Sequence, residues 1–185
     1  MKTGLEIQTD RVVLRAWNTG DEDQVAFHRL NSEPAVMQFF ASIRTRQETD
    51  TLLDRVLKMN SEQGYGWVAI DLKSTGEAIG FSGIASVNDF DAAFLPADEI
   101  GWRLLPEHWH RGYATEAATA LLEHAFDVLN SGRIVSFAVP ANVASVNVMK
   151  RIGMIAQPEL DFDHPNVPDT HPHLKRHVVY TSNRP

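Results

Sequence analysis

The sequence predicts a mixed α+β fold, in which helices flank a mostly antiparallel central sheet and residues 1–185 form one domain. Three observations support this prediction. Two helix-like segments near the N-terminus are followed by three strand-like segments in succession, which is typical of an antiparallel meander. A long amphipathic helix then separates this meander from the next strand. A short helix and two final strands complete the expected order, β-αα-βββ-α-β-α-ββ.

The first third of the chain contains one strand-like and two helix-like segments. Residues 11–17 (RVVLRAW) are largely apolar and β-branched, which predicts the opening strand. Residues 21–31 and 47–62 have helical patterns, and the second gathers apolar residues on one side. Residues 35–45, between the two helices, are expected to form a loop with an apolar patch at Met37, Phe39 and Phe40.

A meander is expected next. Residues 66–72 and 78–87 have strand-like composition, and the Ser-Thr-Gly within residues 73–77 suits a hairpin turn between them. Residues 99–105 alternate in character and end at Pro106, because proline cannot donate to a strand ladder. This third strand leads directly into the most informative part of the sequence.

The clearest helix follows that strand. Its apolar residues recur at helical spacing and form one stripe: Ala114, Ala117, Ala118, Leu121, Leu122, Ala125, Phe126 and Leu129. A β-branched strand at 133–139 and a short helix at 142–151, capped by Asn142, come next. Final strands are expected at about 154–160 and 174–182, which completes the sheet.

Composition and charge exclude several classes of protein. Hydrophobic residues make up 43% and charged residues 22%, as in an ordinary globular chain. The net charge is −7 without a Lys/Arg cluster, which argues against a nucleic-acid surface. The absence of cysteine excludes disulfides and thiolate metal sites. No apolar run approaches the roughly 20 residues that span a bilayer, and the N-terminus lacks the apolar core of a signal peptide. We therefore expect a cytoplasmic protein with no membrane partner.

Residues 110–115 are predicted to bind a diphosphate. Gly112 allows the backbone to approach a ligand closely, and Ala114 adds little side chain. The first N–H groups of the long helix have no partners within the helix, and the helix dipole is positive at that end. Arg111 or His110 could supply positive charge. For His110, a position as a solvated surface residue is the favoured alternative.

Two further residues belong to this loop. Thr115 could add a hydroxyl contact to the same ligand, and Tyr113 is expected to pack under the loop. The alternative is that Gly112 and Ala114 only form a tight turn between strand and helix.

Three ordered motifs resemble the GNAT superfamily of acetyl-CoA N-acetyltransferases, in its RimJ/RimL-like branch. The opening ETERLxLRxW pattern of that branch corresponds to residues 6–17, and the central EIGWxLxPxxWxxGYATEA pattern to residues 99–117. The pattern NxxSxxVMxxxGM corresponds to residues 142–154, so the resemblance covers roughly residues 5–182. One departure is Trp109, which stands where most of the superfamily has Gln or Arg and is expected to contribute packing.

The resemblance implies a GNAT-like fold and transfer of an acetyl group from acetyl-CoA to a primary amine within a ternary complex. Glu99 is then the candidate general base, acting through a water, and the backbone N–H of Leu104 would hold the acetyl carbonyl. Asn142 would cap its helix and touch the pantetheine arm. Many members place a tyrosine where this chain has Met149, so Ser145 or a water is left as the acid.

Other roles stay open for two of these residues. Glu99 could instead make a surface ion pair or bind the substrate ammonium, and Ser145 could serve only its own helix. The acceptor is expected to be a protein N-terminus or a small-molecule amine, and a homodimer is compatible with the resemblance. A silent CoA-binding or sensing module is the main alternative function. A nucleotide-binding regulatory domain is another.

Residues 157–173 (QPELDFDHPNVPDTHPH) are expected to form a long ordered loop, because their prolines cannot extend a sheet interior. Their Asp and His spacings match no standard zinc motif, so no metal is expected. Asp161 and Asp163 would instead attract a cationic amine to the acceptor side.

Overall fold

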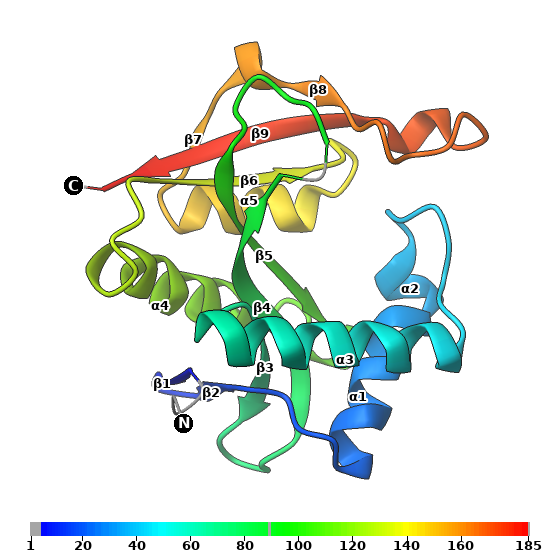
Figure 1. Ribbon diagram of the computed structural model, residues 1–185, viewed down its shortest axis with the longest axis vertical. Helices are drawn as coiled ribbons and strands as arrows, with labels where there is room; N and C mark the ends of the chain where they lie inside the picture. Colours follow the sequence, from blue (N-terminus) through cyan, green and yellow to red (C-terminus); the bar gives the residue numbers. More distant parts are fainter. Residues whose placement is uncertain (1–4, 89, 185) are drawn as a thin grey trace.

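The computed structural model describes residues 5–88 and 90–184 and has the predicted α+β architecture (Figure 1). Residues 1–4, 89 and 185 of the predicted domain lie outside the described residues. The strands form one sheet in the order β1-β2-β3-β4-β5-β6-β9-β7, and β8 also pairs with β9. Their bounds are β1 Glu6–Gln8, β2 Val12–Arg15, β3 Trp67–Leu72, β4 Ala78–Val87, β5 Ala97–Leu104, β6 Arg133–Ala138, β7 Ile155–Ala156, β8 Phe162–Asp163 and β9 Arg176–Asn183.

The sheet opens with a hairpin where a single strand was expected over 11–17. The short strand β1 pairs antiparallel with β2, and the amide of Thr9 donates to the carbonyl of Val12 in the turn between them. This difference matters for the site, because the turn reaches the helix that follows β5.

Helices α1 (Asp21–Ser32), α2 (Pro34–Met37) and α3 (Arg46–Gln63) follow β2. The expected loop over 35–45 is helical at its start, where Pro34 occupies the first turn that proline tolerates. Thr45 and Glu48 form a capping box at the start of α3, which satisfies two free N–H groups. Apolar residues of α1 and α3 pack on one face of the sheet: Phe27, Leu30, Leu53 and Val56, against Trp17, Ala69 and Leu105.

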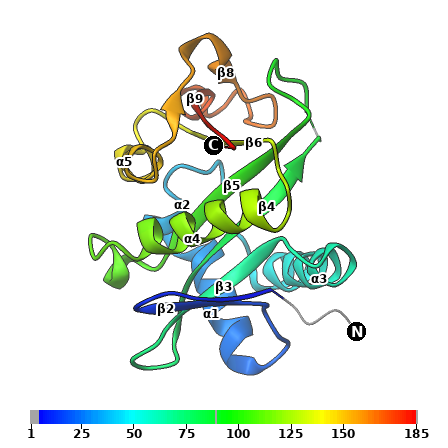
Figure 2. The ribbon, with the colours of Figure 1, turned by 90° about the vertical axis from the view of Figure 1, so that its left-hand side faces the viewer.

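Helix α4 (Tyr113–Asp127) covers the opposite face of the sheet (Figure 2). The predicted apolar stripe is its buried face, which comprises Ala117, Ala118, Leu121, Leu122, Ala125 and Phe126. Burying a side chain such as Leu121 stabilises the fold by about 1.5–3 kcal/mol. The part of the chain that the structure describes contains no helix long and apolar enough to cross a membrane.

Strands β5 and β6 form the one parallel pair among the described strands, and they separate soon after they meet. Their register consists of Asp98 opposite Ile134 and Glu99 opposite Val135. Beyond this point β5 stays paired with β4, while β6 stays paired with β9. In Figure 1, β4 and β5 run down the molecule and β6 and β9 run across its top. The central sheet is therefore split beside the second half of β5.

The C-terminal part is less strand-like than predicted. The helix expected at 142–151 is present as α5 (Val143–Arg151). The strand expected at 154–160 is only β7, because the chain turns into a 3-10 helix at Pro158–Leu160. The loop 157–173 holds the short strand β8, and β9 begins after a second 3-10 helix at Pro172–Leu174.

Candidate active site

The loop between β5 and α4 begins with a 3-10 turn at Pro106–His108 and then reverses direction. Two of its residues have left-handed backbones, His110 with φ 59° and Gly112 with φ 84°. Glycine tolerates this conformation without strain, and here Gly112 is the N-cap of α4. A Cβ at Gly112 would meet only the guanidinium of Arg11, at 3.3 Å. The loop therefore presents bare backbone at the start of a helix.

The first N–H groups of α4 are free to bind an anion. Helix hydrogen bonding starts with the amide of Glu116, which donates to the carbonyl of Gly112. No side chain caps the helix, so the amides of Tyr113, Ala114 and Thr115 have no acceptor among residues 5–88 and 90–184. With the positive end of the helix dipole, these amides fit a pyrophosphate.

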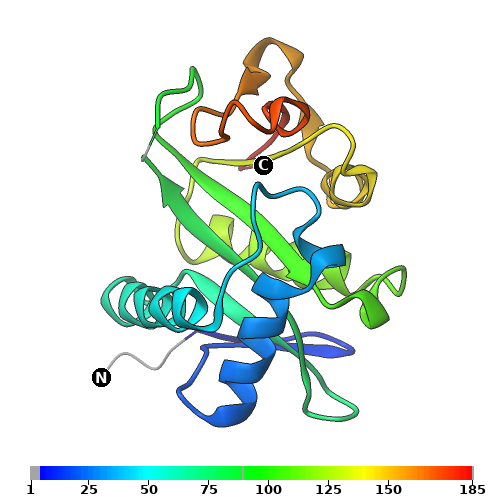
Figure 3. The ribbon, with the colours of Figure 1, turned by 90° about the vertical axis from the view of Figure 1, so that its right-hand side faces the viewer.

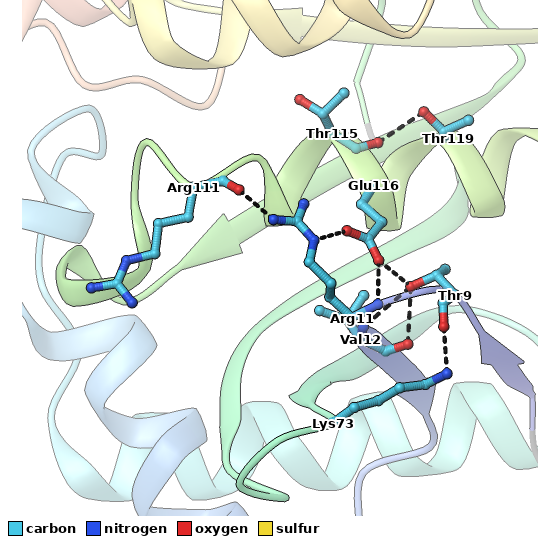
Figure 4. Close-up of polar contacts among 8 residues, drawn as sticks. All are labelled: Thr9, Arg11, Val12, Lys73, Arg111, Thr115, Glu116 and Thr119. Atoms are coloured by element: carbon cyan, nitrogen blue, oxygen red, sulfur yellow. Dashed lines mark hydrogen bonds and ion pairs between the residues drawn. The ribbon is translucent and has the colours of Figure 1, made fainter.

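Arg11, from the turn between β1 and β2, holds this helix start in place (Figure 4). Its Nε lies 2.7 Å from Oε2 of Glu116, and its backbone amide donates to Oε1 at 2.8 Å. Its Nη1 donates to the carbonyl of Arg111 at 2.9 Å, within the loop itself. The hydroxyl of Thr9 also donates to Glu116, at 2.6 Å. Sequence reasoning missed Arg11, whose only signal was its place in the opening motif.

These contacts also set the charge of Glu116. Burial would raise the pKa of Glu116, but hydrogen bonds from Thr9 and Arg11 outweigh it and hold the pKa below its usual value. Glu116 is therefore ionised at neutral pH, and Arg11 balances its charge. Without Arg11, the first turn of α4 would present an uncompensated negative charge near the anion site.

Trp109 does more than the packing expected of it. Its indole Nε1–H donates to the carbonyl of Leu104 at 2.8 Å. This bond ties the loop to the last residue of β5, which is buried. Trp109 thus fixes the distance between the end of the strand and the free amides of α4.

The backbone of β5 directs donors into the split of the sheet. The amide of Leu105 donates to the carbonyl of Ile79, and Gly80 lies opposite Leu104 in the same antiparallel register. Because an antiparallel ladder alternates, the N–H groups of Trp102 and Leu104 point away from β4. They point toward the side where β6 has already separated. A chain-like ligand lying in the split could accept hydrogen bonds from both.

Glu99 lies in the first half of β5, near where β5 and β6 part, as the strand position predicted. It is half-buried. Its Oε1 is 3.8 Å from the position that a Cβ at Gly101 would take, so its carboxylate lies toward the second half of the strand. The same Cβ would come within 2.9 Å of the ring of Trp67. Gly101 is therefore required for Trp67 to lie over the strand beside Glu99.

Helix α5 follows β6 on the other side of the split and packs against α4. The side chain of Asn142 caps this helix by accepting from the amide of Ser145 at 3.2 Å, which confirms the capping prediction. Ser145 is half-buried in the first turn. Met149 is buried in the main core at 1% exposure, so its side chain has no access to the split.

The other predicted loop residues have different surroundings. The side chains of His110 and Arg111 are exposed, and Figure 4 shows Arg111 pointing away from Arg11. Tyr113 is half-buried, with the guanidinium of Arg11 4.8 Å from its ring centroid. The carbonyl of Thr115 accepts from Thr119, and its side chain is half-buried.

The acidic residues of the loop 157–173 are used within the fold. Asp161 accepts from the amide of Val179 at 2.9 Å, and Arg176 lies within 4.0 Å of Asp161 and 3.7 Å of Asp163. Arg176 thus offsets part of the charge of these two carboxylates, and Asp163 stays largely exposed. Their role in attracting a cationic amine stays a prediction. Within the described ranges, no three His, Asp or Glu side chains converge as metal ligands.

Known proteins are similar to this chain in sequence or in fold. The uncharacterized protein YkkB from Bacillus subtilis (strain 168) is 33% identical over 158 residues, which cover 83% of this chain and 87% of that protein. An acetyltransferase from Agrobacterium tumefaciens str. C58 is 31% identical, with a TM-score of 0.76 and coverage of 97% of this chain and 94% of that chain.

A GNAT-family acetyltransferase from Bacillus anthracis has the same fold at a TM-score of 0.78 and 22% identity, covering 97% of this chain and 99% of that chain. The family described as "Acetyltransferase (GNAT) domain" matches residues 11–155. The chain therefore belongs to the GNAT acetyltransferase family.

Proposed function

We propose that this chain, as one domain of the RimJ/RimL-like branch, transfers the acetyl group of acetyl-CoA to a primary amine in a ternary complex. The observation that carries the proposal is the presence of two sets of backbone donors, one in β5 and one at the start of the helix that follows it. The free amides at the start of α4 fit a pyrophosphate, and the N–H groups of Trp102 and Leu104 face the split of the sheet. A single extended ligand with a diphosphate at one end satisfies both sets.

The residues that would hold acetyl-CoA follow from this arrangement. The amides of residues 113–115 face the pyrophosphate, beside bare backbone at Gly112. Arg111 and His110 add nearby positive charge from exposed positions. The pantetheine arm would accept hydrogen bonds from the N–H of Leu104 and from the side-chain NH2 of Asn142, which has no acceptor among the described residues. The side-chain oxygen of Asn142 is already used to cap α5.

The thioester supplies an activated acyl carbon: the amine nitrogen attacks it, the C–N bond forms, the C–S bond breaks and the thiol leaves. Two protons must move. Glu99, through a water, takes the proton that the amine nitrogen loses. Ser145 or a water returns a proton to the departing sulfur, because Met149 can donate none.

Distance along the strand refines the position of the acetyl carbonyl. At about 3.3 Å per residue, the Cα atoms of Glu99 and Leu104 are roughly 16 Å apart, which is more than a glutamate side chain and one bridging water can span together. Trp102 is only about 10 Å from Glu99 on the same estimate, and the carboxylate of Glu99 lies toward it. We therefore assign the carbonyl to the N–H of Trp102 and leave Leu104 to the pantetheine arm.

A calorimetric titration of acetyl-CoA tests the cofactor half of the proposal. The wild-type protein should bind it, and Gly112→Glu should abolish binding by placing a side chain and a negative charge at the anion site. Gly132→Glu is the matched control, because a side chain at Gly132 meets nothing within 4 Å. Failure of the wild type to bind would overturn the proposal, and displacement of acetyl-CoA by ATP would favour the nucleotide-binding alternative.

A screen of primary amines tests the catalytic half. Glu99→Gln should lower kcat about 100-fold without changing the affinity for acetyl-CoA, as expected when a general base is removed. Glu62→Gln, on the exposed side of α3, is the control. Binding of acetyl-CoA without turnover of any amine, small or peptide, would instead identify a silent sensing module. A homodimer and a cytoplasmic location stay predictions.

A further inference from the structure

We infer that the acceptor carries an anionic group, a carboxylate or a phosphate, next to its reactive amine, and that Arg103 binds this group. The inference rests on the proposed function, because it names the substrate class of the same site. Arg103 is in β5, one residue after Trp102, and its side chain is on the face of the sheet that also bears Glu99. A group bound by Arg103 would thus lie on the same side of the strand as the proposed base.

The surroundings of Arg103 hold the guanidinium firmly. Its Nη1 donates to Oδ1 of Asn31 at 2.6 Å and to the carbonyl of Leu30 at 3.3 Å, at the end of α1. The guanidinium carbon is 4.3 Å from the ring centroid of Phe40 and 5.0 Å from that of Phe81. One donor edge is therefore fixed by uncharged acceptors, and aromatic rings orient the plane.

No carboxylate among residues 5–88 and 90–184 forms an ion pair with this cation. The ion pairs among the described residues all involve other arginines and lysines, and the charge that acts on Arg103 is that of another cation, Arg44. Burial, reinforced by the charge of Arg44, lowers the pKa of Arg103 to about 10, so Arg103 remains charged at neutral pH. Because a buried charge is costly unless it is paired, an unpaired arginine beside a reaction site indicates a missing anionic partner.

The free edge of the guanidinium has the geometry to bind that partner. The Nε and Nη2 atoms carry three N–H donors, and neither atom makes a hydrogen bond in the part of the chain that the structure describes. These donors match the paired oxygens of a carboxylate or a phosphate in a bidentate arrangement. Arg103 is only partly exposed, so the edge is accessible but largely desolvated.

The loop 38–45 covers one side of the Arg103 guanidinium. Figure 3 shows it rising beside β5, and Phe40 is 48% exposed although its ring lies over the guanidinium. The amide of Arg44 donates to the carbonyl of Asn31, which keeps this second cation near Arg103. Two cations, Arg103 and Arg44, therefore lie near each other on this side of β5.

Matched acceptor pairs test the inference. Glycylglycine is compared with glycylglycine amide, and O-phosphoethanolamine with ethanolamine, at saturating acetyl-CoA. We expect kcat/KM to be at least about tenfold higher for one anionic member, through a lower KM. The two pairs distinguish a carboxylate site from a phosphate site. A preference that came only from amine reactivity would favour glycylglycine amide, whose amine has the lower pKa.

Variants then assign the preference to Arg103. Arg103→Gln should bring the ratio of kcat/KM within the preferred pair close to one, and Arg103→Lys should restore part of it. Arg184→Gln, at an exposed position near the C-terminus, removes one charge and should keep the ratio. If Arg103→Gln keeps the ratio, or if the wild type shows none, the inference is wrong.

A binding measurement separates this inference from the proposed function and from loss of folding. The acetylated products are titrated into the wild type and into Arg103→Gln, both saturated with CoA. The products form two pairs: N-acetylglycylglycine with its amide, and O-phospho-N-acetylethanolamine with N-acetylethanolamine. Tighter binding of either anionic product by the wild type alone supports the inference even if turnover is slow. Equal binding within both pairs overturns it, whereas failure to bind acetyl-CoA overturns the proposed function. If Arg103→Gln no longer binds CoA, Arg103→Lys takes its place in this comparison.

Discussion

Arg11 and Glu116 are 105 residues apart in sequence, yet the Nε of Arg11 lies 2.7 Å from Oε2 of Glu116. The pair joins the turn between β1 and β2 to the first turn of α4. Because Arg11 also holds the carbonyl of Arg111, the N-terminal hairpin restrains the loop that is proposed to bind the pyrophosphate. Residues at a remote edge of the sheet therefore help to position this loop.

Replacing Arg11 tests this positioning role. Arg11→Ala should raise the Kd for acetyl-CoA about tenfold, or about 1.4 kcal/mol, because the loop loses its restraint and Glu116 loses its balancing charge. Calorimetry measures the affinity. Arg46→Ala, which removes an exposed ion pair on α3, should leave it unchanged. An unchanged affinity in Arg11→Ala would show that the pair serves stability alone.

Alanine substitutions at Gly112 and Gly76 distinguish the cost of backbone strain from the loss of ligand contact. Both have left-handed backbones, with φ of 84° and 74°, so alanine should cost each about 1 kcal/mol of unfolding free energy. Only Gly112→Ala should also weaken acetyl-CoA binding, by about tenfold. Denaturation and calorimetry on both variants provide the comparison. A parallel loss of affinity in Gly76→Ala would refute the local explanation.

Trp109 can be tested against Trp17. Trp109→Phe removes the donor to the buried carbonyl of Leu104, which should cost about 1–3 kcal/mol of stability beyond the lost packing. Trp17→Phe removes an indole N–H that is buried without a partner among the described residues, so it should cost packing only. Urea unfolding gives both values, and the affinity for acetyl-CoA should fall only in Trp109→Phe. Equal costs would contradict the role of the indole bond.

Acid should destabilise the protein through His177. Burial lowers the pKa of His177, opposed by its hydrogen bond with the Lys175 carbonyl and the charge of Asp163. The unfolded state therefore binds this proton more tightly, so the stability contributed is present above about pH 6.5 and is lost as the pH falls through that value toward the lowered pKa. His124, whose pKa burial also lowers, adds to the same slope.

Unfolding free energies measured between about pH 5 and 7.5 give this slope. His177→Phe keeps a ring among the neighbouring aromatic residues and should flatten the slope. His173→Phe, at an exposed position, should not change it. The same slope in all proteins would exclude His177 as its source.

Much of the fold follows from local patterns. The stripe of apolar residues correctly predicted α4. Pro106 and Gly153 correctly indicated where β5 and α5 end. The predicted order of elements was wrong or incomplete where the strands are short. The hairpin partner β1 and the two-residue strand β7 depend on pairing with distant strands and leave little trace in sequence.

The candidate site divides in the same way. The left-handed turn at Gly112 and the helix after it were predictable, because the loop is continuous in sequence and its proposed anion binding depends on the local backbone. The hydrogen bond of Trp109 was not predicted, since nothing in sequence shows that its indole reaches the carbonyl of Leu104. The contacts of Arg176 with Asp161 and Asp163 were not predicted either, because they join the loop to the start of β9.

The sequence by itself therefore determined the order of most elements, the loop that is proposed to bind the pyrophosphate and the family motifs, all of which depend on residues close together along the chain. Only the tertiary structure decided that β5 and β6 part beside Glu99, that Arg11 restrains the loop and that Arg103 has no carboxylate partner in the described part of the chain. The physical reason is that strand separation and charge compensation are set by contacts between distant segments. Such contacts exist only once the core has brought those segments together.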